Sequence, residues 1–266
     1  MITVAVTTFN RTDIVGRAVQ SALRFAIAVE GRVVLVDDGS IDGTAAMVAR
    51  DFRDVLQNGT LTYIQHPTNL GVTAAKNSAF AQAVPGWVLF LDSDDQLLPE
   101  AAERVAGLLL KHDDKALVFF RCVDETGAFV GTGFDTPQWL SLRRYCLHSS
   151  YGEALIAINK AVAPDGPFDA DLRGYEGIGC ARLIKHHGPA LLATVIARCY
   201  NRSRSDRLSS AHNMLKRAHY LARGHLRYVS LCGHEMGLGM RLILRIKAFL
   251  YFSAGVLARV LWFRNA

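Results

Sequence analysis

The four apolar residues 88–91 (VLFL) are followed directly by an acidic sequence, residues 92–95 (DSDD). Such a short apolar run predicts a strand buried on both faces, as in a parallel sheet. Side chains two residues apart on an extended chain point the same way, so Asp92 and Asp94 can converge on one point. Converging carboxylates repel unless a cation lies between them, and hard divalent ions prefer oxygen ligands. The pattern predicts a metal site at a strand end; the alternative is a solvated acidic turn before a helix near Pro99.

Apolar runs alternate with helical patterns along the first half of the chain. We expect strands at 2–8, 33–36, 61–64, 87–91 and 117–120, and helices at 12–25, from 44, up to about 83, and at 99–111. This alternation predicts an α/β fold with a doubly wound, mostly parallel sheet and right-handed crossovers. Ligands of such sheets bind beyond the carboxyl ends of the strands, where Thr7, Asp38 and Asp92 fall. The chain contains neither GxGxxG after the first strand nor GxxxxGK[ST], so dinucleotide and P-loop functions lack their fingerprints.

The 266 residues, half of them hydrophobic, suffice for one large domain or one domain plus a tail. The strand pattern begins at Ile2, so we expect no signal peptide. The chain has an odd number of scattered cysteines and no CxxC pair. This favours reduced thiols in a cytosol over a disulfide framework or a zinc site.

Charge is unevenly distributed along the chain. Residues 201–266 carry 12 Lys/Arg and two acids, whereas residues 1–200 carry a net charge of −4. A basic tail on an acidic body predicts an anionic partner: membrane headgroups, a lipid-phosphate substrate or nucleic acid. The sequence contains no motif that reads RNA or DNA. We therefore expect a membrane surface and no nucleic acid.

Four motifs carry a resemblance to a known family. They are residues 6–11 (VTTFNR), 36–44 (VDDGSIDGT), 69–77 (NLGVTAAKN) and 91–95 (LDSDD). In order, spacing and strand context they closely resemble family-2 glycosyltransferases of the GT-A fold, over about residues 1–125. The resemblance implies a nucleotide-sugar donor, most commonly a UDP-sugar, one divalent ion (Mn²⁺ or Mg²⁺), and transfer with inversion at the anomeric carbon.

The resemblance also implies roles for residues near the nucleotide base. Thr7 and Phe9 would border the base, and Asp38 would accept a hydrogen bond from it. Lys76 stands where the family often has Arg, near the base or the diphosphate. Read from the residues alone, Asp38 could instead belong to a helix-capping turn and Lys76 to a solvated helix face.

The same resemblance assigns the acidic motif. Asp92 would face the ribose and the metal, Ser93 would contact the nucleotide-sugar, and Asp94 would ligate the metal between the two phosphates. Asp95 would be a further ligand or an orienting group. The physical logic is independent of the family, because a divalent ion neutralises a nucleoside diphosphate leaving group without proton transfer.

Inversion requires a general base that takes the proton from the acceptor hydroxyl. The family usually places an Asp, in a Glu-Asp pair, at a helix start after a Gly-Phe-Asp turn, and residues 166–169 read GPFD. Counting back from Arg182 puts Glu176 on the base position, with Tyr175 replacing the usual Glu. Counting forward from the turn puts Glu176 on the first acid and Gly177 where the Asp is expected. We take Glu176 as the base.

Other residues of this half are weaker candidates. Asp169 and Asp171 are alternatives for the base, although turn and cap roles suit them better. Trp139 could stack on a sugar ring or anchor the surface. Arg204 and Arg207 lie in a basic loop that could approach the donor phosphates. The composition of residues 126–150 is typical of a mobile acceptor loop.

The sequence pattern of the tail, residues 206–266, predicts two helices, the second at about residues 238–263. Its longest uncharged run, residues 248–258, is 11 residues long, whereas about 20 are needed to cross a bilayer. Arg241, Arg245 and Arg259 fall on one stripe, and apolar residues cover the rest. This predicts an amphipathic helix in a membrane interface. The alternatives are a helix packed on the domain and a homodimer contact.

Together these patterns predict a GT-A-type chain with a helical basic extension. Residues 1–125 would bind the nucleotide-sugar, residues 126–205 would form the acceptor and catalytic half, and residues 206–266 would be the amphipathic tail. We expect a metal-dependent, inverting hexosyltransferase acting on a saccharide or lipid-linked acceptor in cell-surface or exopolysaccharide synthesis. It would be cytoplasmic and peripheral on the inner face of the membrane.

Two alternatives to this activity stay open. One is a non-catalytic module that binds a sugar-nucleotide or lipid. Gly177, which stands at the expected position of the base in one of the two counts, favours this alternative. The other is a nucleotidyltransferase, which shares the sheet and the metal logic but usually carries a Gly-rich basic loop after the first strand. Residues 7–12 contain no such loop.

Overall fold

The computed structural model describes the chain except for residues 132–133, 148–152, 203–210 and 264–266. For residues 211–213 and 256–263 the description covers the backbone alone. The strands are β1 (Ile2–Thr8), β2 (Arg32–Asp37), β3 (Leu61–Gln65), β4 (Trp87–Asp92), β5 (Gln96–Leu97), β6 (Leu117–Asp124), β7 (Gln138–Leu140), β8 (Ala154–Asn159) and β9 (Ala190–Tyr200). The helices are α1 (Val15–Ala28), α2 (Thr44–Asp51), α3 (Arg53–Gln57), α4 (Val72–Gln82), η1 (Pro99–Ala101), α5 (Ala102–Lys111), α6 (Leu142–Leu147), η2 (Ala170–Leu172), α7 (Glu176–His187), α8 (Ala211–Lys216), α9 (Ala218–Cys232), η3 (Gly233–Glu235) and α10 (Leu238–Phe263).

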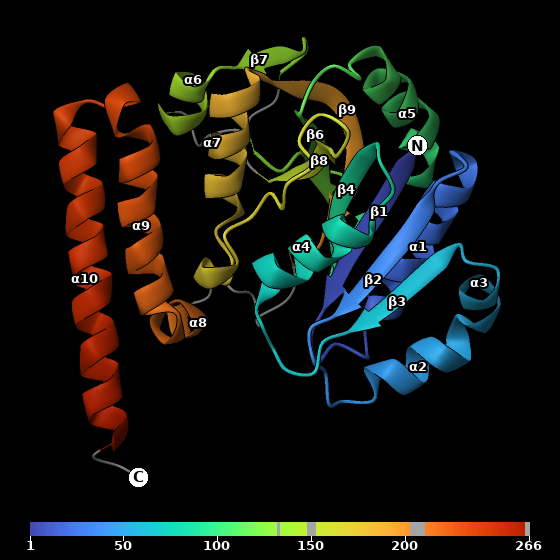
Figure 1. The fold of residues 1–266 in the computed structure, drawn as a ribbon, viewed down its shortest axis with the longest axis horizontal. Helices are drawn as coiled ribbons and strands as arrows, with labels where there is room; N and C mark the ends of the chain where they lie inside the picture. Colours follow the sequence, from blue (N-terminus) through green and yellow to red (C-terminus); the bar gives the residue numbers. More distant parts are fainter. Residues whose placement is uncertain (132–133, 148–152, 203–210, 264–266) are drawn as a thin grey trace.

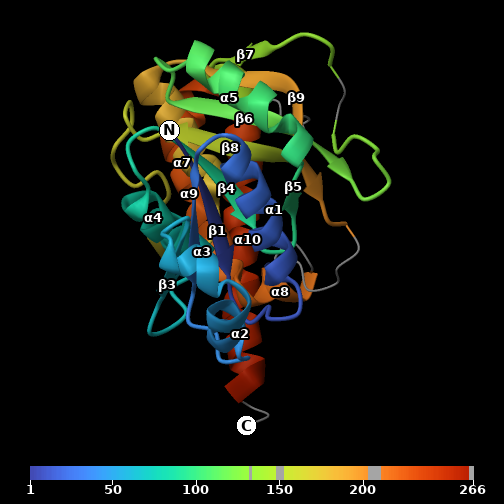
Figure 2. The ribbon, with the colours of Figure 1, turned by 90° about the vertical axis from the view of Figure 1, so that its right-hand side faces the viewer.

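Within the described residues the strands form one curved sheet in the order β3-β2-β1-β4-β8-β6-β9-β5, with β7 paired to β9 (Figures 1 and 2). Strands β1 to β4 are parallel neighbours. Strand β8 runs antiparallel between β4 and β6, and β9 is parallel to β6. The predicted mostly parallel α/β sheet is therefore confirmed. The antiparallel strands β5, β7 and β8 were not predicted from the sequence.

Helices cover both faces of the sheet because alternate residues of each strand point to opposite sides. Val4 and Val6 of β1 belong to the core under α1 and α5. Ala5, between them, belongs to the second core under α4 and α7. Burying each large aliphatic side chain contributes about 1.5–3 kcal/mol relative to exposure. The two cores hold the carboxyl ends of the strands at a fixed edge.

Most predicted elements of the first half lie where the sequence placed them. The exception is the first helix, which begins at Val15 instead of residue 12. The N–H groups of Ile14 and Val15 both donate to the carbonyl oxygen of Arg11, so a turn precedes the helix. Residues 126–150, predicted as a loop region, include β7 and α6.

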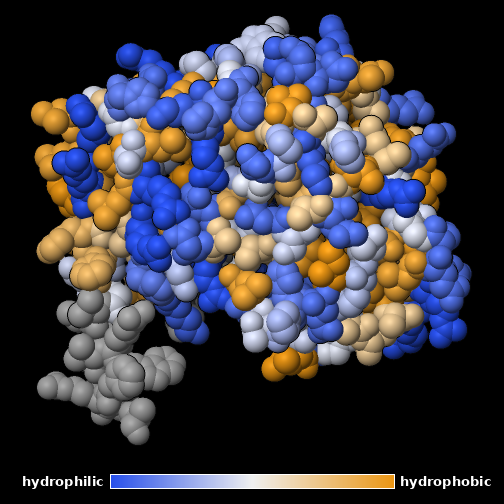
Figure 3. Space-filling model, in the orientation of Figure 1, coloured by the Kyte–Doolittle hydropathy of each residue, from blue (hydrophilic) through white to orange (hydrophobic). Residues whose placement is uncertain are grey.

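The described part of the C-terminal tail contains the α-helices α8, α9 and α10 and the short helix η3, and α9 and α10 lie on the side of α7 that faces away from the sheet (Figure 1). Helix α9 lies against α7 and η2, and α10 lies antiparallel on the outer side of α9. Apolar side chains of α10 are exposed: Leu238, Leu242, Ile243, Ile246, Phe249, Leu250 and Phe252. In Figure 3, hydrophobic and hydrophilic surface alternate along the left edge, where Figure 1 shows α10. Among the described residues no helix is long and apolar enough to cross a membrane.

Candidate active site

The carboxyl ends of β1, β2 and β4 meet at one edge of the sheet, where a cleft of about 770 Å³ opens. The strand register places Thr7 beside Asp92, and Thr8 beside Asp37. Seven of the eight residues selected from the sequence line this cleft: Thr7, Phe9, Asp38, Asp92, Ser93, Asp94 and Glu176. The eighth, Lys76, is buried and contacts two of these residues.

Asp92 and Asp94 each form an ion pair. Oδ1 of Asp92 lies 2.9 Å from Nζ of Lys76, and Oδ2 of Asp94 lies 3.0 Å from Nη1 of Arg11. The same Arg11 nitrogen donates a hydrogen bond of 3.1 Å to Oγ of Ser93. Asp92 keeps 42% of its side chain exposed, against 16% for Asp94. Asp92 is therefore the more open of the two carboxylates.

The donor chemistry of this pair fits a divalent ion. Two carboxylates supply hard oxygen ligands, and the open cleft beside them can admit phosphate oxygens. No group of three or more Asp, Glu, His or Cys side chains that could hold an ion occurs in the described part of the chain. An ion at Asp92 and Asp94 would therefore take its remaining ligands from a substrate or from water.

Lys76 connects the acidic motif to the candidate base. Its Nζ lies 2.9 Å from Oδ1 of Asp92 and 3.1 Å from Oε1 of Glu176, and its side chain is 7% exposed. Burial acts to lower the pKa of Lys76 and to raise that of Asp92, but their mutual attraction outweighs it. The pKa of the Lys76 ammonium is raised and that of Asp92 is lowered. The solvated helix face considered for Lys76 is therefore wrong.

Both carboxylate oxygens of Asp38 have partners within the protein. Its Oδ1 lies 2.7 Å from Nδ1 of His66 and accepts the N–H of Leu70 at 2.9 Å, while its Oδ2 accepts the N–H of Gly71 at 2.7 Å. Gly71 is the residue before α4, so Asp38 holds the loop that starts this helix. Asp38 thus fixes the loop before α4 without forming a side-chain cap of α2 or α4, and its expected contact with a nucleotide base stays a prediction.

Two further residues from the end of β1 offer different chemistry to the cleft. Phe9 exposes 41% of its surface, which gives a flat apolar face for a ring to stack on. Oγ1 of Thr8 is buried and has no hydrogen-bond partner among the described residues. An unpaired buried hydroxyl costs free energy unless a ligand satisfies it.

Glu176 is the first residue of α7 and lines the cleft with 27% of its side chain exposed. Its Oε1 accepts from Lys76, and no described residue bonds to its Oε2. Gly177 follows it, and the Gly177 carbonyl accepts a hydrogen bond from the hydroxyl of Tyr145 at 3.3 Å. Of the carboxylates considered as base, Glu176 is the one that lies in the cleft.

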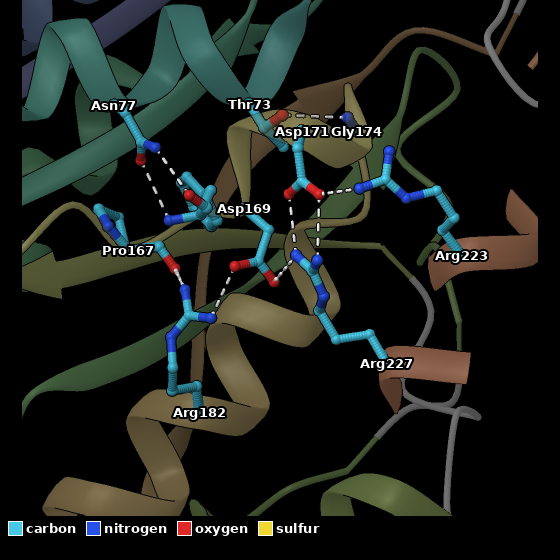
Figure 4. Close-up of polar contacts among 10 residues, drawn as sticks. Thr73, Asn77, Pro167, Asp169, Asp171, Gly174, Arg182, Arg223 and Arg227 are labelled. Atoms are coloured by element: carbon cyan, nitrogen blue, oxygen red, sulfur yellow. Dashed lines mark hydrogen bonds and ion pairs between the residues drawn. The ribbon is translucent and has the colours of Figure 1, made fainter. Parts of the chain in front are cut away.

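Asp169 and Asp171, the alternative bases, do not line the cleft and are bound by arginines (Figure 4). Asp169 Oδ1 accepts from Arg182 at 2.8 Å. Asp171 accepts two hydrogen bonds from Arg227, at 2.8 and 3.0 Å. Hydrogen bonding to Arg227 is the main cause that lowers the pKa of Asp171. Both carboxylates act in holding the tail.

Asp95, the last residue of the acidic motif, is buried beside β9. It is 1% exposed, its Oδ2 lies 3.1 Å from Nη1 of Arg198, and its Oδ1 accepts the N–H of Asn201 at 2.9 Å. Burial raises the pKa of Asp95 to about 7 against the opposing attraction of Arg198. Asp95 therefore anchors β9 to the strand end and does not reach the cleft.

The cleft also contains residues that the sequence analysis did not select. They are Arg11, Glu153, Arg173, Tyr200, Lys216, Arg217 and Tyr220, among others. Three of them come from the tail, which was expected to serve the membrane. The excess of basic residues in the tail was the one available signal. Trp139, in contrast, packs edge-on against His112 at 5.7 Å and lies away from the cleft; Arg204 and Arg207 lie outside the described residues.

The sequence model of glycosyl transferase family 2 matches residues 3–152 of the chain. The chain therefore belongs to this family of GT-A glycosyltransferases, as the four motifs predicted, and the nucleotidyltransferase alternative falls.

The most similar curated proteins include a chondroitin synthase of Pasteurella multocida, 28% identical over 141 residues. The succinoglycan biosynthesis protein ExoO of Rhizobium meliloti is 34% identical over 105 residues. A GalNAc(5)-diNAcBac-PP-undecaprenol β-1,3-glucosyltransferase of Campylobacter jejuni is 25% identical over 190 residues. These matches cover 52%, 39% and 69% of this chain, and 14%, 28% and 60% of the relatives.

Solved structures show the same fold. TarS of S. aureus (residues 1–349) superposes with a TM-score of 0.64 at 17% identity, covering 94% of this chain and 71% of that one. TarS has also been solved with UDP-GlcNAc. The mannosyltransferase PcManGT of Pyrobaculum calidifontis, solved with GDP-Man and Mn²⁺, gives a TM-score of 0.62 at 17% identity, covering 97% and 75%.

Proposed function

We propose that this glycosyltransferase moves a sugar, with inversion, from a UDP-sugar to a hydroxyl group of a saccharide or lipid-linked acceptor in the synthesis of a cell-surface or secreted polysaccharide. The observation that carries the proposal is the chain of contacts Asp92–Lys76–Glu176 within one cleft. It supports the proposal because Lys76 links Glu176, which would take the proton, to Asp92, which would face the donor diphosphate. The polysaccharide context rests on the names of the relatives, and the UDP-sugar on the TarS complexes.

Thr7, Phe9, Asp38 and Ser93 form the donor end of the proposed site. Phe9 offers the exposed ring for the nucleotide base. Asp38 would act mainly by holding residues 69–71, because its carboxylate already accepts hydrogen bonds from that loop. A contact from Asp38 to the base would use its remaining acceptor capacity.

Asp94 and Asp92 would hold Mn²⁺ or Mg²⁺. When bound, the ion would supply positive charge that stabilises the departing nucleoside diphosphate. Arg11 currently occupies Oδ2 of Asp94, so it would exchange partners when the diphosphate and the ion enter. Arg11 is then placed to bond a phosphate oxygen itself.

Glu176 would act as general base. Its Oε2, to which no described residue bonds, would take the proton of the acceptor hydroxyl while the acceptor oxygen bonds to the anomeric carbon. The bond from that carbon to the diphosphate oxygen breaks, and its electron pair leaves with the nucleoside diphosphate. Lys76 would hold Glu176 through Oε1, which leaves Oε2 to accept the proton.

The outer face of α10 would place the enzyme on the cytoplasmic membrane. Its exposed apolar residues are flanked by the exposed cations Arg245 and Lys247, a composition that suits an interfacial helix. The side chain of Arg259, the third member of the predicted basic stripe, lies outside the described part of the helix. The competing proposal is a homodimer contact through the same face. Flotation with anionic vesicles and sedimentation without them would separate the two.

Calorimetry with UDP, GDP and dTDP, each with and without Mn²⁺, tests the donor assignment. We expect metal-dependent binding of UDP, weakened about tenfold or more in Asp94→Ala, because one of two protein ligands is lost. Asp114→Ala, an exposed carboxylate outside the cleft, is the control. No metal-dependent binding of any nucleotide would overturn the assignment. Nucleotide binding without transfer to any acceptor extract would favour the non-catalytic module.

A further inference from the structure

The C-terminal tail is docked on the segment that leads into Glu176. Nη2 of Arg217 donates to the carbonyl oxygens of Arg173 at 2.8 Å and Gly174 at 3.3 Å. The hydroxyl of Tyr175 lies 2.8 Å from Nδ1 of His225. The Tyr175 ring lies over Gly224, where an added Cβ would come within 2.6 Å of it. These contacts involve the three residues immediately before Glu176, so the tail fixes one wall of the cleft.

Arg173 lies on the same wall, held by a special backbone conformation. Its φ of +52° is in the left-handed region, which non-glycine residues rarely adopt. From there its side chain reaches the loop before α4, donating from Nε to the Leu70 carbonyl at 3.1 Å and from Nη2 to Oδ1 of Asn69 at 2.6 Å. Gly71 makes room for it, because a Cβ at Gly71 would lie 2.8 Å from the Arg173 side chain.

This wall concentrates positive charge. Arg173, Lys216 and Arg217 all line the cleft, and among the described residues none of them forms an ion pair with a carboxylate. The other cations of the site differ, since Lys76 bonds two carboxylates and Arg11 bonds Asp94. Within the described part of the chain, Arg173 and Arg217 donate to neutral carbonyl and amide oxygens, so no direct ion pair compensates either charge.

The pKa of Arg217 responds to the charges of Glu176 and Arg173, so these three side chains lie close together on the Glu176 side of the cleft. Burial lowers the pKa of Arg217 and Arg173 lowers it further, while Glu176 is the carboxylate that attracts it. Two neighbouring guanidinium groups that are partly removed from water repel each other unless an anion joins them.

We propose that Arg173, Lys216 and Arg217 form a subsite for a phosphate group of the acceptor, next to the hydroxyl that Glu176 deprotonates. Guanidinium and ammonium groups together match phosphate oxygens in charge and hydrogen-bond geometry. The inference rests on the proposed function, because it takes Glu176 to mark the acceptor position. Acceptors with a phosphate close to the glycosylated sugar would be preferred over neutral saccharides.

Lys216 gives the sharpest test, because it is exposed and bonds no described residue, so that replacing it leaves the fold intact. The probe is methyl phosphate, titrated into the full chain saturated with UDP and Mg²⁺, which is diamagnetic, and followed by the ³¹P line width. We expect Lys216→Glu to weaken methyl phosphate binding at least about tenfold, since one charge-assisted bond is lost and a repelling charge is gained. Lys185→Glu is the matched control, an exposed lysine in the last turn of α7.

The outcomes separate the subsite from the proposed function. Equal methyl phosphate binding in Lys216→Glu and Lys185→Glu would overturn the subsite. Loss of methyl phosphate binding on UDP saturation in the unmodified chain would also overturn it, by assigning the cations to the donor diphosphate. UDP binding measured in the same samples reports on the donor site independently, and we expect both variants to retain it.

Discussion

The two walls of the cleft are built differently. The donor wall comes from the ends of β1, β2 and β4, and its charged groups are paired with one another or with backbone N–H groups. The opposite wall comes from residues 173–176 and from the tail. Among the described residues, Arg173 and Arg217 of this wall donate to neutral oxygens and Lys216 has no partner. The donor wall is therefore preorganised with balanced charge, whereas the tail wall holds net positive charge.

This difference indicates that the two walls bind different substrates. A balanced wall can exchange an internal partner, such as Arg11 on Asp94, for the metal and diphosphate of a common donor. An unbalanced wall selects for the charge of its ligand, which suits the acceptor. Variants at the boundary between the walls should therefore separate donor binding from transfer, and variants in the tail should do so more weakly.

Glu176→Gln should have the largest effect. The amide cannot accept the acceptor proton, so we expect the transfer rate to fall about 10²–10⁴-fold. UDP binding by calorimetry should be retained, because Glu176 belongs to the acceptor side. The control is Glu103→Gln, an exposed glutamate on α5 away from the cleft. A Glu176→Gln enzyme with unimpaired transfer would rule out this residue as the base.

Lys76→Met should affect both walls, because Lys76 contacts Asp92 and Glu176 together. Removing one partner of a buried ion pair costs about 3–5 kcal/mol, and we expect about half of this since both carboxylates are partly exposed. Denaturant unfolding would measure the loss. Lys76→Arg keeps the charge and should recover most of the stability; equal losses in both variants would show that packing at Lys76 matters more than its charge.

The donor wall was predictable from the sequence because its determinants are local. Apolar runs fix the strands, and the parallel topology then brings Thr7, Asp38 and Asp92 to one edge without further information. Glu176, which contacts Lys76, is 100 residues away from it in the sequence. Its role as the base could be inferred only from the resemblance to a family. Counting back from Arg182 and counting forward from the Gly-Phe-Asp turn gave base positions that differed by one residue. The position of Glu176 in the cleft favours the first count.

The tail wall was not predictable for a physical reason. Lys216 and Arg217 read as part of a basic amphipathic helix, and the sequence does not reveal which face of α9 meets the domain. That choice depends on Gly224 leaving room for Tyr175 and on arginines meeting Asp171, which are long-range contacts. Strand β8 escaped prediction similarly, since its antiparallel place between β4 and β6 depends on tertiary pairing.

Gly224→Ala should disturb the docking of the tail on Tyr175 and leave the donor wall unchanged. Its Cβ would lie 2.6 Å from the Tyr175 ring, and overpacking of this kind costs about 1–3 kcal/mol, offset by up to about 1 kcal/mol of helix propensity. We expect a lower transfer rate with unchanged UDP binding. Gly107→Ala in α5 is the matched control, since nothing lies within 4 Å of the added methyl group. It should stabilise the protein slightly, and a similar gain in Gly224→Ala would contradict the proposed docking.

The smallest expected effect is the pH dependence of tail docking. The pKa of Asp171 is lowered by its hydrogen bonds to Arg227 and by Arg227 and Arg223 charge. A carboxylate with a lowered pKa in the folded state contributes stability that is present above its unfolded pKa of about 3.9 and is lost as the pH falls through the folded value. Because Asp171 is 43% exposed, the contribution should stay below about 1 kcal/mol. The free energy of unfolding, followed in urea from pH 6 to pH 3, should fall less steeply in Asp171→Asn than in the unmodified chain. Parallel curves would show that these arginine contacts are too solvated to hold the tail. The docking would then rest on the Tyr175 and Arg217 contacts and on the apolar packing of Cys232 and Met236 against Ala181 of α7.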